Sequence, residues 1–392
     1  MFEAVEDYPV DPIMIGMDLF AQDPRKDKLN LTVGIYEDAE GRTPVLNAVK
    51  QAERLLVERQ ETKAYTALTG DAAYCDTLGD ALFGSLHDGV VTAQTAGGAV
   101  ALRVAADLLA QMPSRPTVWV QTPTYGNYIP ILNAAGTPWQ AVPYYDQARA
   151  QVTFDAMLDG LKAARPGDLF LVQGVCHNPT GADMTPEQFD ALLDLLEARG
   201  IVPWIDLAYL GFADSFDADC QMARKVLARF DESIVCITLS KSFGIYRDRA
   251  GALFLKTRPA QRARVKRAIT AIIRSNTSHA PDHGASVVRT ILGDSALKAL
   301  WLGELDAMRT RVAGVRQDIV REARARHNRD DLDFLAGQRG MFSLLPVTTA
   351  EEEALTRDHG IHVVKGGRVN VARLRGGDVA TLVDAVFVVK AL

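Results

Sequence analysis

Cysteine is scarce in this sequence. Only four occur among the 392 residues, namely Cys75, Cys176, Cys220 and Cys236, and no two of them form a Cys-x-x-Cys pair. Four thiols are too few to cross-link a chain of this length, and disulfides persist mainly in oxidising compartments. We therefore expect reduced cysteines in a soluble cytoplasmic protein.

Long apolar runs and basic tracts are also missing. No stretch of about 18 apolar residues occurs, so we expect no transmembrane helix and no membrane partner. Residues 1–11 contain acidic residues and proline where a secretory signal has a basic start and an apolar core. The net charge of −6 and the lack of a Lys/Arg-rich tract argue against nucleic acid as a main partner.

The motifs of several enzyme classes are absent as well. The sequence has no Walker-type phosphate loop, no Gly-x-Gly-x-x-Gly and no His-Glu-x-x-His, and its seven histidines show no metal-ligand spacing. These absences disfavour nucleotide hydrolysis, dinucleotide-dependent redox chemistry and zinc-dependent hydrolysis. We expect no metal.

The alternation of helical and strand-like segments along the chain favours an α/β fold. With 392 residues, of which 48% are hydrophobic and 23% charged, the chain is long enough to form two domains. Helical and strand-like segments alternate from about residue 45 to about residue 290, as in a mostly parallel sheet covered by helices. The expected strands are 118–120, 169–172, 201–205, 234–239 and 251–255.

One helix between these strands has clear end signals. Thr185 is a candidate N-cap, Pro186 suits the first helical position, and Gln188 completes a capping box. Gly200 is placed to end the helix. The next strand delivers Asp206 at its carboxyl end, although a proline within it would remove one ladder hydrogen bond.

The pattern in the last third of the chain predicts a second domain. A helix from about residue 295 to about 326 is too long for one layer of an α/β domain, and short strands follow at 340–345 and 368–371. We expect the first forty residues to join these strands. The expected division is a large domain, 41–304, and a smaller α/β domain, 1–40 with 305–392, which closes over an active site between the two.

Lys241 is the first candidate for chemistry. The apolar run 234–239 places it just beyond a buried strand, at the edge where open α/β sheets bind ligands. Ser240 precedes it and Arg249 follows eight residues later, which suits a lysine Schiff base beside a phosphate. The alternative is an ordinary surface lysine after a strand.

Other residues could meet the remaining demands of a pyridine cofactor. Asp206 could keep a ring nitrogen protonated, or it could cap a helix. Asn178 lies in an Asn-Pro turn, and both it and Tyr209 could hydrogen-bond a ring oxygen. Gly97 and Gly98 precede a helical run and could free backbone N–H groups for a phosphate, or form a simple turn.

Taken together, the motifs resemble those of the fold-type I, class I aminotransferases, and among these the aspartate and aromatic amino acid aminotransferases. The matching segments occur in family order and span nearly the whole chain. They are Asn30–Tyr36, Lys63–Tyr65, Gln94–Gly98, His177–Gly181, Asp206–Tyr209, Ser240–Lys241 with Arg249, Arg274, Gly340–Ser343 and Gly367–Asn370.

The resemblance implies pyridoxal 5′-phosphate as cofactor and a ping-pong transfer of an amino group between an L-amino acid and a 2-oxo acid. Lys241 resembles the Schiff-base lysine that also shuttles the substrate proton. Asp206 resembles the partner of the pyridinium nitrogen, and Asn178 and Tyr209 resemble the partners of the ring oxygen.

The resemblance also implies a homodimer with shared active sites. Tyr65 resembles a tyrosine that reaches the phosphate of the neighbouring subunit. Arg274 resembles an arginine that crosses the interface to a side-chain carboxylate, or swings aside for aromatic substrates; the alternative is a solvated arginine after a basic helix. Arg368 resembles the clamp for the α-carboxylate, and Gly34 a backbone contact to the substrate.

Three departures from the family pattern concern the pocket. Tyr125 stands where a tryptophan usually stacks on the cofactor, and Ala99 stands where the phosphate loop usually offers a hydroxyl. Thr277, His279 and Ala280 replace an aromatic residue, Asn and Pro beside the arginine. These changes keep one alternative open, a lyase, decarboxylase or racemase on the same scaffold. A further alternative is a non-catalytic binding module that inherited the fold, against which the retention of Lys241, Asp206 and Arg368 argues.

Overall fold

A seven-stranded sheet forms the centre of the molecule. The computed structural model describes residues 2–7 and 10–391. The strand order is β2 (Val91–Ala96), β10 (Ala250–Lys256), β9 (Ser233–Thr238), β8 (Val202–Leu207), β7 (Leu169–Gln173), β3 (Val118–Thr122) and β4 (Trp139–Pro143). β10 runs antiparallel to both of its neighbours, and the other pairs are parallel. All five strands expected from the sequence are present, each with slightly different ends.

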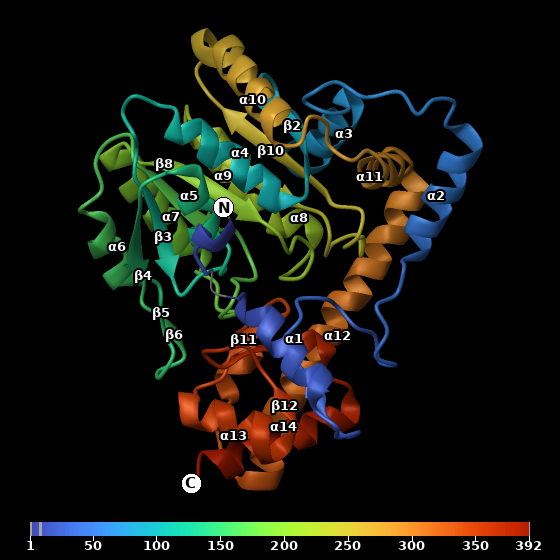
Figure 1. Cartoon of the computed structure of the whole chain (residues 1–392), viewed down its shortest axis with the longest axis vertical. Coiled ribbons are helices and arrows are strands. Elements are labelled where there is room, and N and C mark those ends of the chain that lie inside the picture. The colour runs from blue at the N-terminus through green and yellow to red at the C-terminus, as the bar shows by residue number, and fades with distance from the viewer. Residues whose placement is uncertain (1, 8–9, 392) are drawn as a thin grey trace.

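Helices cover both faces of this sheet (Figure 1). One apolar cluster joins the sheet to α4 (Gly98–Ala110), α5 (Tyr128–Ala135) and α10 (Arg262–Asn276). The opposite cluster includes residues of α3 (Ala72–Phe83), α6 (Phe154–Leu161), α7 (Pro186–Arg199), α8 (Phe216–Asp219), α9 (Gln221–Arg229) and α11 (His283–Gly293). Leu169 and Leu171 of β7 face the first cluster while Phe170 faces the second, so this strand is apolar on both sides.

The local signals around α7 act as the sequence predicts. The Thr185 hydroxyl accepts from the backbone N–H of Gln188, and the Gln188 side chain accepts from the backbone of Thr185, which completes the capping box. Gly200 ends the helix with a φ of 66°, a left-handed conformation that suits glycine. β8 is a central strand although it contains Pro203, because its remaining residues still pair with β7 and β9.

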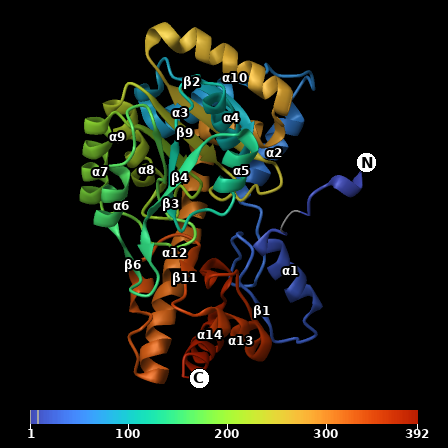
Figure 2. The same ribbon diagram turned by 60° about the vertical axis from the view of Figure 1, so that its left-hand side comes forward.

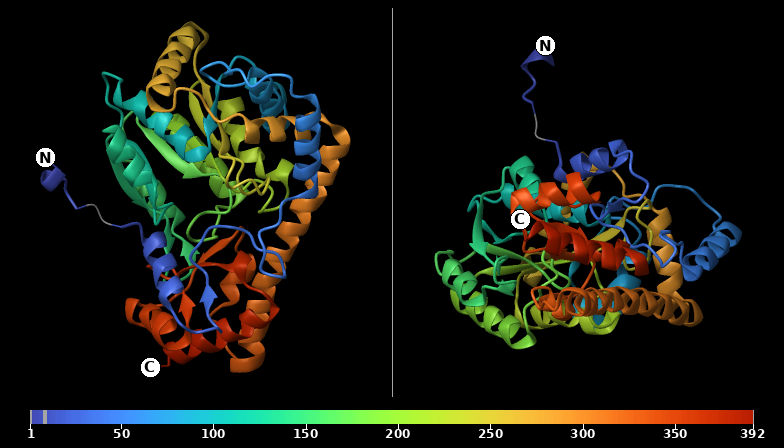
Figure 3. Two further views of the ribbon diagram at one scale, coloured as in Figure 1. Left: turned by 45° about the vertical axis from the view of Figure 1, so that its right-hand side comes forward. Right: turned by 90° about the horizontal axis from the view of Figure 1, so that it is seen from below.

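The long helix α12 (Ser295–His327) leads away from the sheet to the other end of the molecule (Figures 1 and 3). There it packs on α14 (Gly376–Val389), close to α13 (Thr349–His359). The antiparallel pair β11 (Phe342–Leu344) and β13 (Arg368–Asn370) also lies at this end. Two further short strands, β5 (Tyr145–Asp146) and β6 (Gln151–Val152), form a hairpin beside the main sheet.

The N-terminal segment joins the C-terminal end of the chain. β1 (Leu29–Asn30) pairs in parallel with β12 (Ile361–His362), and α1 (Pro12–Gln22) packs next to it (Figure 2). A buried side-chain contact of 2.8 Å between His362 Nε2 and the Asp23 carboxylate also connects these segments. The remaining helix, α2 (Asn47–Arg59), packs on α11 and α12. Among the described residues, none of the helices combines the length and the apolar character that crossing a membrane requires.

Candidate active site

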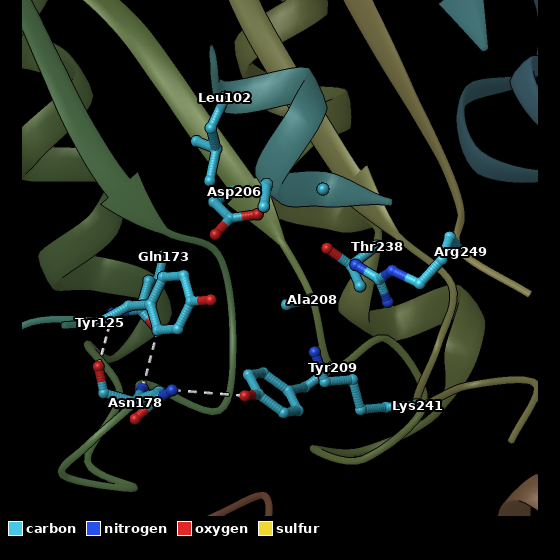
Figure 4. Close-up of a pocket in the computed structure, with 12 residues that line it drawn as sticks. Leu102, Tyr125, Gln173, Asn178, Asp206, Ala208, Tyr209, Thr238, Lys241 and Arg249 are labelled. Atoms are coloured by element: carbon cyan, nitrogen blue, oxygen red, sulfur yellow. Dashed lines mark hydrogen bonds between the residues drawn. The ribbon is translucent and has the colours of Figure 1, made fainter. Parts of the chain in front are cut away.

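A pocket opens where β7, β8 and β9 end, at the carboxyl edge of the parallel strands (Figure 4). Its volume is about 60 Å³, and it adjoins a second cavity of about 500 Å³ that shares Tyr125 and Asn178 with it. The first pocket is lined by Gly98, Ala99, Leu102, Tyr125, Gln173, Asn178, Asp206, Ala208, Tyr209, Thr238, Lys241 and Arg249.

Lys241 lies in this pocket, three residues beyond the end of β9. Its Nζ is 5.1 Å from the centre of the Tyr209 ring. Burial lowers the pKa of the Lys241 ammonium to about 8, although the nearby Asp206 carboxylate acts in the opposite direction. An amine with this pKa is partly unprotonated near neutral pH, which a nucleophile requires.

Asp206 faces the same pocket from within β8, one residue before the end of the strand rather than after it. Tyr128 donates a hydrogen bond of 2.6 Å to its Oδ2. Its Oδ1 is buried and has no partner among the described residues. Burial raises the pKa of the carboxyl group to about 6, opposed by the Tyr128 hydrogen bond and the charge of Lys241.

The unpartnered Asp206 Oδ1 indicates that the pocket binds a group with a hydrogen-bond donor. A buried carboxylate oxygen is costly unless a donor satisfies it. A protonated pyridine nitrogen, as in pyridoxal phosphate, supplies a single N–H donor with a positive charge. The residues present therefore fit this cofactor at its nitrogen end.

Asn178 and Tyr209 lie together on the other side of the pocket, where Asn178 Nδ2 is 3.4 Å from the Tyr209 hydroxyl. Arg368 approaches them from β13: its Nη1 is 3.5 Å from Asn178 Oδ1, and its Nη2 donates to the Thr32 carbonyl at 2.7 Å. The guanidinium lies 4.6 Å from the Phe342 ring centre, and burial lowers its pKa. It lines the larger cavity.

Arg249 and Thr238 mark the opposite end of the pocket from Asn178 (Figure 4). Arg249 donates to the Ser240 hydroxyl at 3.2 Å, and α4 begins here at Gly98. A Cβ on Gly97 would lie 2.6 Å from the Arg249 guanidinium, and one on Gly98 would lie 1.9 Å from the Thr238 hydroxyl. A helix N-terminus, a guanidinium and a hydroxyl thus converge, and these groups bind a phosphate well.

Six predicted residues do not line this first pocket: Gly97, Ser240 and Arg368, whose contacts involve its lining residues, and Gly34, Tyr65 and Arg274. Gly34 packs against the Phe342 ring, where an added Cβ would lie 3.0 Å from it. Tyr65 is 87% exposed and stacks on His279 with ring centres 4.7 Å apart. Arg274 is exposed at the end of α10 and donates to the Ser278 hydroxyl. The predicted roles of Tyr65 and Arg274 concern a second subunit and stay predictions.

The sequence analysis assigned no role to Thr238, Gln173 or Tyr128. Thr238 ends β9 and Gln173 ends β7, so the rule that strand ends face the ligand could have identified both. Tyr128 had a weaker signal, because it begins a helix and reaches Asp206 only through the tertiary fold. Ser240 was selected, and its hydroxyl contacts Arg249 without lining the pocket itself.

Comparison with known proteins identifies the family. The model of "Aminotransferase class I and II" matches residues 26–386. The aspartate aminotransferase of Escherichia coli is 40% identical over 99% of this chain and 100% of its own length, and the tyrosine aminotransferase of Rhizobium meliloti is 40% identical over 97% and 98%. A crystal structure of an aromatic-amino-acid aminotransferase from Burkholderia pseudomallei, covalently bound to pyridoxal phosphate, has a TM-score of 0.96 at 36% identity and covers 99% of both chains. The chain therefore belongs to the class I and II aminotransferases.

Proposed function

We propose that this protein transfers an amino group between an L-amino acid and a 2-oxo acid with pyridoxal phosphate as cofactor. The observation that carries the proposal is the pairing of Lys241, an amine of lowered pKa, with the unpartnered buried oxygen of Asp206 in one pocket. The relatives named above, one of them solved with this cofactor, support it. When bound, pyridoxal phosphate supplies an electron sink for the charge left on the substrate Cα.

The proposed roles follow from where each side chain lies. Lys241 would hold the cofactor through its amine, and the same amine is placed to move the proton of the substrate Cα. Asp206 would keep the ring nitrogen protonated, while Asn178 and Tyr209, which contact each other, would hydrogen-bond the ring oxygen. The groups that would hold the phosphate are Arg249, Ser240, Thr238 and the backbone of Gly97, Gly98 and Ala99, and Tyr125 would cover the ring.

Arg368 is the proposed site for the α-carboxylate, because its buried guanidinium can make two parallel hydrogen bonds to it. Gly34 contributes a backbone contact nearby. The adjoining cavity of about 500 Å³ is lined partly by Pro12, Ile13 and Leu344, which leaves room for an apolar side chain. Aspartate, glutamate and aromatic amino acids are the proposed donors, with Arg274 of a second subunit binding the side-chain carboxylate.

A homodimer with shared sites is part of this proposal. Tyr65 and Val57 are 87% and 85% exposed, so both side chains are free to contact a second copy. Residues 41–304 would form the cofactor domain, and 1–40 with 305–392 the smaller domain that closes over it. The buried thiols of all four cysteines support a reducing compartment, the cytoplasm.

Hybrid dimers test the shared site. Neither Lys241→Ala nor Arg274→Ala should transaminate aspartate efficiently by itself. After the two are unfolded and refolded together, half of the dimers should be hybrids with one intact site, giving about a quarter of the parent activity. Activity that stays at the level of the separate variants would refute sharing.

Absorbance and product analysis test the reaction itself. The parent should convert bound cofactor to its amine form when given an amino acid alone, release one equivalent of 2-oxo acid, and turn over only when a second oxo acid is added. Lys241→Ala should lose turnover, while Lys162→Ala, at an exposed lysine paired with Asp159, should keep it. Sustained turnover without a second oxo acid would favour the lyase, decarboxylase or racemase alternative.

A further inference from the structure

Tyr128 makes the one side-chain hydrogen bond that Asp206 has among the described residues. The phenol oxygen lies 2.6 Å from Asp206 Oδ2, a short distance typical of a hydroxyl that donates to a charged carboxylate. Both groups are deeply buried, with Tyr128 only 1% exposed. The carboxylate is therefore fixed at one oxygen and open at the other.

The surroundings of Tyr128 allow it to act only as a donor. Burial and the negative charge of Asp206 raise its pKa well above the usual value for tyrosine, so the phenol keeps its proton throughout the working pH range. Its ring packs edge-on against Tyr125, with centres 5.3 Å apart, and it occupies the first position of α5. The donor is thus rigidly placed as well as permanently protonated.

Few other groups near Asp206 can titrate. Lys241 is the neighbouring cation, and Tyr125 and Tyr209 are buried phenols with raised pKa values. Cys236 is opposite Asp206 in β9, and burial raises the pKa of its thiol well above the usual value. On β7 the residue in register is Gln173, which cannot titrate.

We propose that Tyr128 is a positioning residue for the cofactor: its hydroxyl fixes Asp206 Oδ2 so that Oδ1 points at the ring nitrogen as an anion. The inference rests on the proposed function only in naming the ring nitrogen as the group that Oδ1 meets. The Tyr128 hydrogen bond and the charge of Lys241 both favour the charged form of Asp206, in opposition to its burial.

The test compares Tyr128→Phe with Tyr74→Phe. Tyr74 is a matched control, because it is fully buried and donates one hydrogen bond to the Gly251 carbonyl. Tyr128→Phe should bind pyridoxal phosphate about 10- to 100-fold more weakly, as expected when a hydrogen bond to a charged group is lost. Carbon-13 NMR of labelled aspartate in the cofactor-free protein should show the pKa of Asp206 shifted upward. Tyr74→Phe should leave both quantities unchanged.

A double-mutant cycle separates positioning from general destabilisation. If Tyr128 acts through Asp206, then Tyr128→Phe combined with Asp206→Asn should lose no more cofactor affinity than Asp206→Asn alone. Additive losses, or an Asp206 pKa that does not move in Tyr128→Phe, would overturn the inference. Failure of the proposed function has a different outcome: the parent would not bind pyridoxal phosphate at Lys241.

Discussion

Replacing Asp206 by asparagine should make the cofactor-free protein more stable at neutral pH while impairing its function. In the folded protein burial raises the pKa of this carboxyl from 3.8 to about 6, so its charged form is disfavoured by folding. At one pKa unit per about 1.4 kcal/mol, the charged carboxylate costs about 3 kcal/mol of stability. Asparagine has nearly the same shape, and its amide oxygen can still accept from Tyr128.

The direction of the pKa shift determines how the stability difference between the two proteins changes with pH. Because the folded pKa is raised, Asp206 causes no loss of stability below pH 3.8, and the loss grows until the pH passes about 6. The advantage of Asp206→Asn over the parent should therefore be about 1.5 kcal/mol at pH 5 and about 3 kcal/mol at pH 7.5. Urea denaturation of both proteins without cofactor, followed by tryptophan fluorescence, measures this difference at each pH.

Asp168 provides the opposite case in the same protein. It is also buried, but N–H groups of Thr117, Arg165 and Trp119 donate to it. Burial alone would raise the pKa of Asp168, yet these donors hold it below the usual value. Asp168→Asn should therefore be less stable than the parent at neutral pH, and this difference in the free energy of unfolding should shrink as the pH falls. An Asp206→Asn protein that is destabilised at pH 7.5, or whose advantage does not grow with pH, would refute the reasoning.

Two further predictions concern the proposed phosphate site and the proposed role of Arg368 in binding the α-carboxylate. Gly98→Ala should cost about 1–3 kcal/mol of stability and weaken cofactor binding, because its Cβ would lie 1.9 Å from the Thr238 hydroxyl. Gly303→Ala is the control, because Gly303 lies in α12 with open space around it. This variant should gain about 0.5–1 kcal/mol in the free energy of unfolding, measured by thermal denaturation. A loss of stability in Gly303→Ala would contradict the argument. Arg368→Lys should lower kcat/KM at least about tenfold for every amino donor alike, since a lysine cannot bind the carboxylate at two points. A loss confined to dicarboxylates would assign Arg368 a different role.

The sequence predicts best those features that depend on local signals. The capping box at Thr185 and the glycine at position 200 fix α7 within a residue of its expected ends, because caps and left-handed glycines act on neighbouring backbone. The expected α/β class, a fold-type I transferase with a mostly parallel central sheet, is confirmed by the seven-stranded sheet and by the solved relatives. The pyridoxal phosphate expectation agrees with the cofactor of the Burkholderia relative.

The site could be predicted only where strand ends determine it. Asp206 and Lys241 follow from the order of buried strands, and the structure places both in one pocket. Tyr128 could not be found in this way, because its contact with Asp206 spans 78 residues and depends on how α5 packs on the sheet. The roles of Tyr65 and Arg274, and the boundaries at residues 40 and 304, stay predictions, since they depend on a second copy or on closure.

Arg368 connects the N-terminal segment, β13 and the residues that follow the central sheet, because its guanidinium contacts both Thr32 and Asn178. Its guanidinium already donates to the Thr32 carbonyl in the N-terminal segment at 2.7 Å, whereas its contact with Asn178 is long, at 3.5 Å. A substrate carboxylate is a stronger acceptor than the Asn178 amide oxygen and would replace that weaker contact first. Binding would then tie the substrate to Thr32 and β13 while leaving Asn178 free for the cofactor ring oxygen. In this way recognition of the α-carboxylate and alignment of the ring would depend on the same guanidinium.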